Sequence, residues 1–231
     1  MKINNKDVKA FGAKQLTVDI QPPELGNEYD LIESALLPLE FKHNVKLSKV
    51  VTTIYFRGKD RSDIHRNISR LLMEMKSTCV ICFDSYRGFF KGLVASSEIQ
   101  KTKSKQRYIL KVTLNGFFCD EIKTARFNRV AKGEINILGT RTTPCTVRIH
   151  ANSALTGYSI KGFGEDIVIE KASPGEDIII DGITGLVTCA GTNIMDRVDI
   201  WELPALDPGT NKITFTNNTA DVSITYIPMW I

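Results

Sequence analysis

Hydrophobic residues in the first half of the chain recur with the period of a helix in one segment. Its apolar stripe consists of five side chains at i, i+4, i+7, i+8 and i+11: Ile64, Ile68, Leu71, Leu72 and Met75. Ser62 or Asp63 is expected to cap this segment, because a short oxygen-bearing side chain accepts hydrogen bonds from the first free N–H groups of a helix. The pattern predicts an amphipathic helix that packs one face on a core.

Four runs of β-branched, aromatic and other apolar residues predict strands around this helix. Residues 50–56 precede it, and residues 79–83 follow it and end at a turn-like stretch. Residues 89–98 and 107–118 come next and are separated by a polar, lysine-rich segment, which predicts a hairpin. Apolar and polar residues alternate along the second of these runs, so that one face is expected to be buried and the other solvated or paired.

Two stretches of the first half fit neither period. They are residues 21–30, which contain Pro22 and Pro23, and residues 36–46 around Pro38. Long loops or extended arms are expected there, since loops of this length are usually functional or disordered. Arms that clasp a neighbouring copy and surface loops without a role both remain open.

The second half shows no segment with the period of a helix. Its short apolar runs are interrupted by Gly, Pro, Asn and Asp, in turn sequences at residues 173–175, 181–182 and 207–209. Six strands are predicted there, over residues 146–150, 167–170, 178–180, 197–201, 213–216 and 222–227. An all-β second domain follows, for which a β-sandwich is the best fit.

The balance of charge changes sign near residue 132. Residues 1–132 contain 24 Lys and Arg against 14 Asp and Glu, whereas residues 133–231 contain 6 against 12. We therefore expect a mainly β protein of two domains, 1–132 with the helix and 133–231 as the sandwich. The opposite charges could orient one subunit against another, or they could have no role.

Composition indicates a globular protein that is kept in solution. Hydrophobic residues make up 42% of the chain and charged residues 24%, and no stretch reaches the ~18 apolar residues of a membrane helix. The polar N-terminus does not resemble a secretory signal. The five cysteines, an odd number, are scattered, which argues for synthesis in a reducing cytoplasm and against a disulfide framework. No membrane contact is expected.

The cysteines do not form a metal or redox motif. Cys79 and Cys82 have CxxC spacing, but a zinc site needs a second pair of ligands, and Cys119, Cys145 and Cys189 do not supply one. A thioredoxin-like CxxC begins a helix, whereas this one lies in an apolar run. Packing in a core is the favoured interpretation.

The remaining candidate residues also lack a catalytic pattern. His43, His65 and His150 are far apart and have no nucleophile or carboxylate at a recognisable spacing, so each is expected to be structural or exposed. Gly162-Phe163-Gly164 lacks the third glycine and the following helix of a dinucleotide loop, and is expected to be a turn. We expect no catalytic, cofactor-binding or metal-binding residue, and no cofactor.

A basic cluster raises the question of nucleic acid. Lys101, Lys103, Lys105 and Arg107 lie close together between the two runs of the predicted hairpin. Such clusters contact phosphates, but no recognition helix or aromatic stacking motif accompanies this one. A solvated hairpin tip is the favoured interpretation, and sequence-specific binding is not expected.

The order of the C-terminal segments resembles that of the siphophage distal tail proteins. The segments that carry the resemblance are residues 175–187, 201–204, 206–213 and 224–231, in that order and spacing. Residues 50–58, 81–84 and 108–119 agree more diffusely, so that the resemblance extends over nearly the whole chain.

The resemblance implies a structural protein of the phage virion and not an enzyme. It implies an N-terminal domain that closes into a homo-hexameric ring and a C-terminal galectin-like sandwich at the periphery. The ring would be a hub at the distal end of the tail that joins the tail tube protein to tail-associated or baseplate proteins, with a receptor-binding protein as a further candidate partner. Its channel would let DNA pass without sequence-specific binding.

The alternative function is that of a carbohydrate-binding adhesion module that contacts the host cell wall through the sandwich. A sugar site usually contains an aromatic platform beside polar groups. Trp201 and Trp230 lie in predicted strand ends or signature turns, where core or interface roles are favoured. A shared fold does not by itself bring a sugar site with it.

Overall fold

The chain forms two compact units, Met1–Cys119 and Asp120–Trp230. The computed structural model describes residues 1–30, 39–104 and 106–230. Each unit has its own cluster of buried hydrophobic residues. The division after Cys119 assigns to the second unit the residues up to Lys132 that the balance of charge placed in the first domain.

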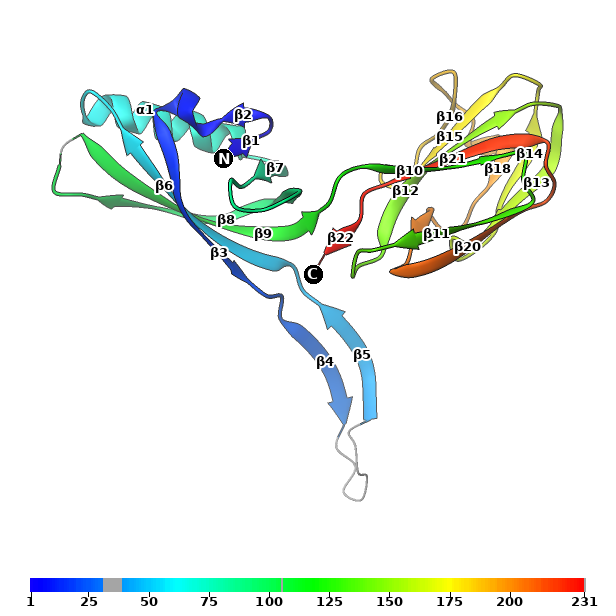
Figure 1. Ribbon diagram of the computed structural model, residues 1–231, viewed down its shortest axis with the longest axis horizontal. Helices are drawn as coiled ribbons and strands as arrows, with labels where there is room; N and C mark the ends of the chain where they lie inside the picture. Colours follow the sequence, from blue (N-terminus) through cyan, green and yellow to red (C-terminus); the bar gives the residue numbers. More distant parts are fainter. Residues whose placement is uncertain (31–38, 105, 231) are drawn as a thin grey trace. The chain divides into compact units, whose positions relative to one another are not determined.

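The first unit is built on an antiparallel sheet (Figure 1). Its strands run in the order β2 (Lys6–Asp7), β1 (Lys2–Ile3), β7 (Cys79–Cys82), β8 (Phe89–Lys101), β9 (Arg107–Cys119), β6 (Ser48–Arg57) and β3 (Ala13–Gln21). Every second residue of β6 and of most of β9 is buried, as expected for a strand with one face on a core. The predicted hairpin is confirmed, since β8 and β9 pair antiparallel.

One α-helix is found among the described residues, α1 (Arg61–Glu74), and it covers one face of this sheet (Figure 1). Its predicted stripe is confirmed: Ile64, Ile68 and Leu71 are buried. The predicted cap is wrong, because the N-cap is Asp60. The Asp60 carboxylate accepts from the Asp63 N–H at 2.8 Å, and the Asp63 carboxylate accepts from the Lys59 N–H at 3.1 Å, which resembles a capping box.

The two stretches without a predicted structure pair with each other and are not loops throughout. β4 (Leu25–Asp30) and β5 (Leu39–Val45) form a two-stranded antiparallel sheet that continues the chain beyond β3 and β6 (Figure 1). At its base the Lys46 N–H donates to the Glu24 carbonyl at 3.1 Å, and the Lys46 ammonium donates to the Glu24 carboxylate at 2.7 Å. The part of the predicted arm at 36–38 lies outside the described residues.

The second unit is a sandwich of two antiparallel sheets. One sheet runs in the order β10 (Lys123–Asn128), β21 (Ala220–Tyr226), β12 (Thr143–Ala151), β15 (Asp177–Asp181), β16 (Val187–Cys189) and β17 (Thr192–Asn193), with β19 (Ala205–Leu206) also on β12. The other runs in the order β11 (Lys132–Ile137), β20 (Gly209–Phe215), β13 (Leu155–Lys161), β14 (Ile167–Ala172) and β18 (Val198–Asp199). Both sheets contribute to one hydrophobic core, which confirms the predicted sandwich.

The remaining elements are short. They are the 3-10 helices η1 (Val8–Phe11) and η2 (Met195–Arg197) and the strand β22 (Met229–Trp230). The predicted strand at 197–201 is only in part a strand, because η2 ends at Arg197 and β18 contains two residues. The likeness of the sandwich to galectins stays a prediction.

Candidate functional site

Polar side chains gather on the outer face of the sheet β10-β21-β12-β15. Buried residues alternate with polar ones in β12 and β21, so that the apolar set faces the core and the polar set faces away from it. The register aligns the outward residues in two rows across the four strands. One row is Asn128, Asp221, His150 and Asp177, and the other is Arg126, Ser223, Arg148 and Ile179.

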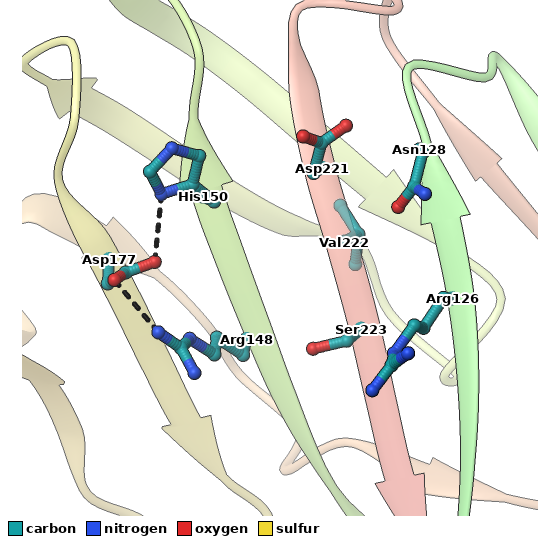
Figure 2. A pocket seen from close by; sticks show the side chains of 8 residues that line it. All are labelled: Arg126, Asn128, Arg148, His150, Asp177, Asp221, Val222 and Ser223. Atoms are coloured by element: carbon teal, nitrogen blue, oxygen red, sulfur yellow. Dashed lines mark hydrogen bonds and ion pairs between the residues drawn. The ribbon is translucent and has the colours of Figure 1, made fainter.

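The two rows form a groove of about 410 Å³, which Figure 2 shows from close by. The residues that line it are Arg126, Asn128, Arg148, His150, Asp177, Asp221, Val222 and Ser223. Its volume is within the range of small-molecule sites, roughly 300–1,000 Å³. Its lining differs from such sites because seven of the eight lining residues have polar or charged side chains and none is Phe, Tyr or Trp.

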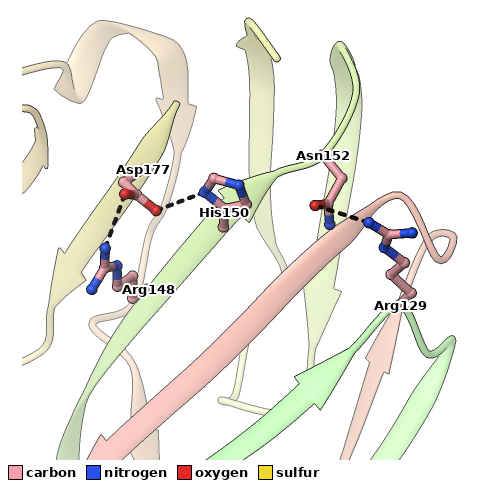
Figure 3. Close-up of polar contacts among 5 residues, drawn as sticks. All are labelled: Arg129, Arg148, His150, Asn152 and Asp177. Atoms are coloured by element: carbon pink, nitrogen blue, oxygen red, sulfur yellow. Dashed lines mark hydrogen bonds and ion pairs between the residues drawn. The ribbon is translucent and has the colours of Figure 1, made fainter. Parts of the chain in front are cut away.

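Asp177 joins two of the basic side chains into a network (Figure 3). Its carboxylate accepts from the Arg148 guanidinium at 2.9 Å and lies 3.0 Å from His150 Nδ1. The Arg148 hydrogen bond holds the pKa of Asp177 below its usual value, and the hydrogen bond to His150 adds to this effect although burial opposes it. The network fixes the directions of Arg148 and His150 before any ligand binds.

At the other side of the groove, Asp221 is incompletely satisfied. Its Oδ1 atom is buried and has no hydrogen-bond partner among the described residues. The hydroxyl of Tyr158, in the opposite sheet, is also buried without a partner there, and burial followed by the Asp221 charge raises the pKa of Tyr158 to about 12. Beyond this end of the groove Arg129 donates to Asn152 at 3.4 Å (Figure 3).

The groove contains both hydrogen-bond donors and acceptors, with balanced charge. Two arginines face two aspartates, so a strongly anionic or cationic ligand gains little net attraction. The arrangement suits a neutral ligand with several hydroxyl or amide groups, because oriented charged side chains make the stronger hydrogen bonds. The lining residues do not include a nucleophile held by a general base, which nucleophilic catalysis would require.

Of these eight residues, the sequence singled out only His150, and as a structural or exposed residue. The eight residues come from four strands that are far apart in the sequence, so only the pairing register brings them together. A signal existed in the alternation of polar residues along 145–151 and 220–226, but alternation does not say which strands are neighbours. His65 is exposed and makes an edge-to-face contact with Tyr108, and the side chain of His43 is outside the described set.

The cysteines lie as the core-packing interpretation requires. Cys79 and Cys82 belong to β7, and their odd spacing directs them to opposite faces of the strand. Cys79, Cys119 and Cys145 are buried, and all five thiols are free. Burial raises the pKa of Cys119 to about 11 and that of Cys145 to about 12.

The other singled-out segments are turns. Gly162 and Gly164 have φ of 115° and 100° on either side of the buried Phe163, which confirms the predicted turn. Lys101 and Lys103 are exposed where β8 leads towards β9, and Lys105 lies outside the described residues. Within 1–30, 39–104 and 106–230, no cluster of potential metal ligands and no helix long and apolar enough to cross a membrane is found.

Among the residues whose side chains the structure describes, Trp201 is the most exposed large hydrophobic residue, with 81% of its surface accessible. A core role for it is therefore wrong. Trp230 is 37% exposed. Neither tryptophan is among the residues that line the groove, so neither serves there as a sugar platform.

Comparison with known proteins agrees with the fold. Residues 138–230 match the family model described as the C-terminal domain of the siphovirus-type tail component. The crystal structure of SPP1 Dit is similar over the whole chain, with a TM-score of 0.79 at 11% identity. The alignment covers 100% of this chain and 98% of SPP1 Dit, which is described as a paradigm of the hub adsorption apparatus in phages that infect Gram-positive bacteria. No curated protein sequence matches.

Two structures of the phage p2 baseplate in its activated conformation are also similar. The one with calcium has a TM-score of 0.56 and the one with strontium 0.55, each at 9% identity over 95% of this chain and 92% of the other. Residues 138–230 are thus similar to the C-terminal domain of siphovirus-type tail components, and the chain as a whole has the fold of SPP1 Dit.

Proposed function

We propose that this protein is the hub at the distal end of the tail, a homo-hexameric ring that joins the tail tube to baseplate or other tail-associated proteins. The observation that supports this most strongly is the likeness to SPP1 Dit over both units and both chain lengths. A receptor-binding protein is a further candidate partner. DNA passes through the channel of the ring without sequence-specific contacts.

The first unit, Met1–Cys119, forms the ring in this proposal, and the sandwich is peripheral. A head-to-tail interface that repeats around a closed axis makes a ring with two different faces, each of which presents a symmetric platform to its own partner. β3 lies at the end of its sheet, and the β4–β5 pair extends the chain beyond it. Edge strands offer unpaired backbone groups to a neighbour, so we assign the contacts between subunits to these elements.

Mass measurement tests the proposal directly. Light scattering of the purified protein should give six times the chain mass of 25.8 kDa, and negative-stain images should show rings. A protein that remains monomeric at high concentration, and also when it is mixed with tail tube protein, would contradict the hub.

Removal of the β4–β5 pair tests the interface assignment. A short Gly-Ser link in place of residues 25–45 should abolish rings but leave the folded units intact, because the bonds between Glu24 and Lys46 already bring the two ends together. Thermal unfolding of the variant should match that of the parent. Intact rings in this variant would remove the pair from the interface.

A second function, weak binding of host-wall glycans, is favoured by the polar groove of the sandwich. Its preorganised Arg148–Asp177–His150 network can exchange hydrogen bonds with sugar hydroxyls. Without an aromatic platform each site is expected to bind in the millimolar range, and six sites on one ring would add avidity.

NMR titration with neutral cell-wall saccharides tests this second function. Shifts should be confined to the groove and should disappear in Asp177→Ala, which leaves Arg148 and His150 unoriented. Asp166→Ala is the matched control, because Asp166 also forms an exposed ion pair in the sandwich, with Lys161, but is not among the groove residues. Equal binding by both variants would exclude the groove.

A further inference from the structure

The most exposed apolar residues of the second unit include four on two turns that lie side by side. Ile183 and Leu186, on the turn between β15 and β16, are 58% and 51% exposed. Trp201 and Leu203, on the segment after β18, are 81% and 44% exposed. We call these four residues the Trp201 patch. Contiguous exposed apolar residues of this kind commonly mark an interaction site.

The two turns are fixed against each other and against β12. A Cβ atom added at Gly185 would lie 3.6 Å from both Leu203 methyl groups, so the two turns lie close together. The Cys145 N–H donates to the Pro204 carbonyl at 3.0 Å, and the Gly182 N–H donates to the Cys145 carbonyl at 3.0 Å. Both turns are therefore hydrogen-bonded to the same residue of the sheet, Cys145, and the patch is a preformed surface.

Asp181 makes the first turn rigid. Its carboxylate accepts from the Ile183 N–H at 2.9 Å and from the Thr184 hydroxyl at 2.7 Å. Its carbonyl accepts from the Gly185 N–H at 2.8 Å, and Gly185 has a φ of 73° that favours glycine. A rigid turn that directs Ile183 and Leu186 into solvent loses little conformational entropy when a partner covers them.

The surroundings of the patch are acidic. No Lys or Arg occurs between Arg197 and Lys212, whereas Asp199, Glu202 and Asp207 are exposed there. The partner that fits is a polypeptide surface with an apolar side chain beside lysines, which match the carboxylates and can also lie over the face of Trp201.

This chain carries such a surface on its first unit. Ile99, 38% exposed, and Lys101 are two residues apart on one face of β8, and the exposed Lys103 follows at the turn. The first unit as a whole has 20 Lys and Arg against 12 Asp and Glu, and residues 120–231 have 10 against 14. We propose that the Trp201 patch of one subunit docks on the β8 end, Ile99 to Lys103, of a second copy.

The proposal rests on the assembly of copies that is proposed above, and it adds a second contact between them. A heterologous contact between the second unit of one copy and the first unit of the next can repeat around the same axis as the ring. Its loss should weaken the oligomer, while the β3 and β4–β5 contacts remain.

Sedimentation against concentration tests the contact in the full chain. Trp201→Ser should raise the concentration at half-dissociation by about thirtyfold, the size of an interface hot spot. Leu186→Ser should weaken it by about tenfold, and its matched control Leu138→Ser, at 58% exposure on the same unit but outside the patch, should not. Unchanged association of Trp201→Ser, with parental thermal unfolding, overturns the proposal.

A charge swap identifies the occupant of the patch. Glu202→Lys alone and Lys101→Glu with Lys103→Glu should each weaken association about tenfold, and the three changes together should restore most of it. Failure to restore overturns the assignment to β8. The outcomes separate this contact from the hub. A parent protein that stays monomeric contradicts both proposals, whereas rings of Trp201→Ser that dissociate at the same concentration as parental rings contradict only the patch.

Fluorescence gives an independent readout. The chain has 2 tryptophans, so Trp230→Phe leaves Trp201 as the single reporter. Its emission should shift to shorter wavelength as the protein assembles, because a side chain that is 81% exposed becomes covered. Emission that stays unchanged through assembly contradicts the docking.

Discussion

Asp181 shows how one ionised side chain can stabilise a surface without being part of it. The hydrogen bond from the Thr184 hydroxyl, with further bonds from the Ile183 and Thr184 N–H groups, lowers the pKa of Asp181 although burial acts in the opposite direction. A carboxylate whose pKa is lower in the folded state stabilises that state above its unfolded pKa, near 3.8, and loses this contribution as the pH falls through the lowered value.

Asp181→Ala should therefore destabilise the sandwich by about 1 kcal/mol at neutral pH, the usual net value of such hydrogen bonds. The difference from the parent should shrink as the pH is lowered below about 4. Urea unfolding followed by tryptophan fluorescence measures it, since both tryptophans belong to the second unit. Asp196→Ala, an exposed carboxylate in the same unit, is the control, and an Asp181 effect that does not depend on pH would contradict the argument.

The thiols should divide by burial when they are titrated. The thiolate is the reactive form, and burial raises the pKa of Cys79, of Cys119 to about 11 and of Cys145 to about 12. At about pH 8 a disulfide reagent should react rapidly with only Cys82 and Cys189, the two partly exposed thiols. Cys82→Ser with Cys189→Ser should abolish the rapid phase, and denaturant should release all five.

At the scale of elements, the capping of α1 illustrates what sequence reasoning resolves and where it stops. The apolar stripe located the helix because its period depends only on neighbours along the chain. The cap was assigned too late by two or three residues, since Asp60, Ser62 and Asp63 are all acceptable caps and the choice depends on the backbone, which is extended at Asp60.

Asp60→Ala should cost about 1 kcal/mol of stability in the first unit, because it leaves the Asp63 N–H without its acceptor. Ser62→Ala should have a smaller effect. Far-ultraviolet circular dichroism during urea unfolding reports on α1. A larger loss of stability for Ser62→Ala than for Asp60→Ala would indicate that Ser62, as the sequence suggested, is the cap.

Strands were predictable where one face is buried and unpredictable where it is not. β6 and β9 alternate cleanly, and their residue types indicate strands. β3 was missed because only one of its nine residues is buried, so that apolar and polar residues do not alternate regularly along it. β13 was missed because Gly157, with φ of 60°, interrupts it. The groove was missed for a related reason, since pairing between distant strands creates it.

At the scale of the whole molecule, the change in charge balance near residue 132 and the division into compact units after Cys119 fall at different places in the sequence. The strand β10, which contains Lys123 and Arg126, lies near the start of the second unit in the sequence and pairs with β21 near its end. Its charges nevertheless resemble those of the first unit. Divided after Cys119, the chain still has a basic first unit and an acidic second one. Charge describes surfaces, whereas a boundary is set by which strands complete which core.

The second unit should therefore fold alone when it is produced as residues 120–230. Its core draws on both of its sheets, and its first residue is tied to its last strand region, since the Asp120 N–H donates to the Pro228 carbonyl at 2.9 Å. The isolated unit should give a dispersed NMR spectrum and the same tryptophan-detected urea midpoint as the full chain. It should also remain monomeric, because it lacks the lysine-bearing end of β8 on which the Trp201 patch is proposed to dock. A disordered segment would show that the core of the second unit needs the first unit. Self-association of the folded segment would show that the Trp201 patch binds another second unit and not the β8 end.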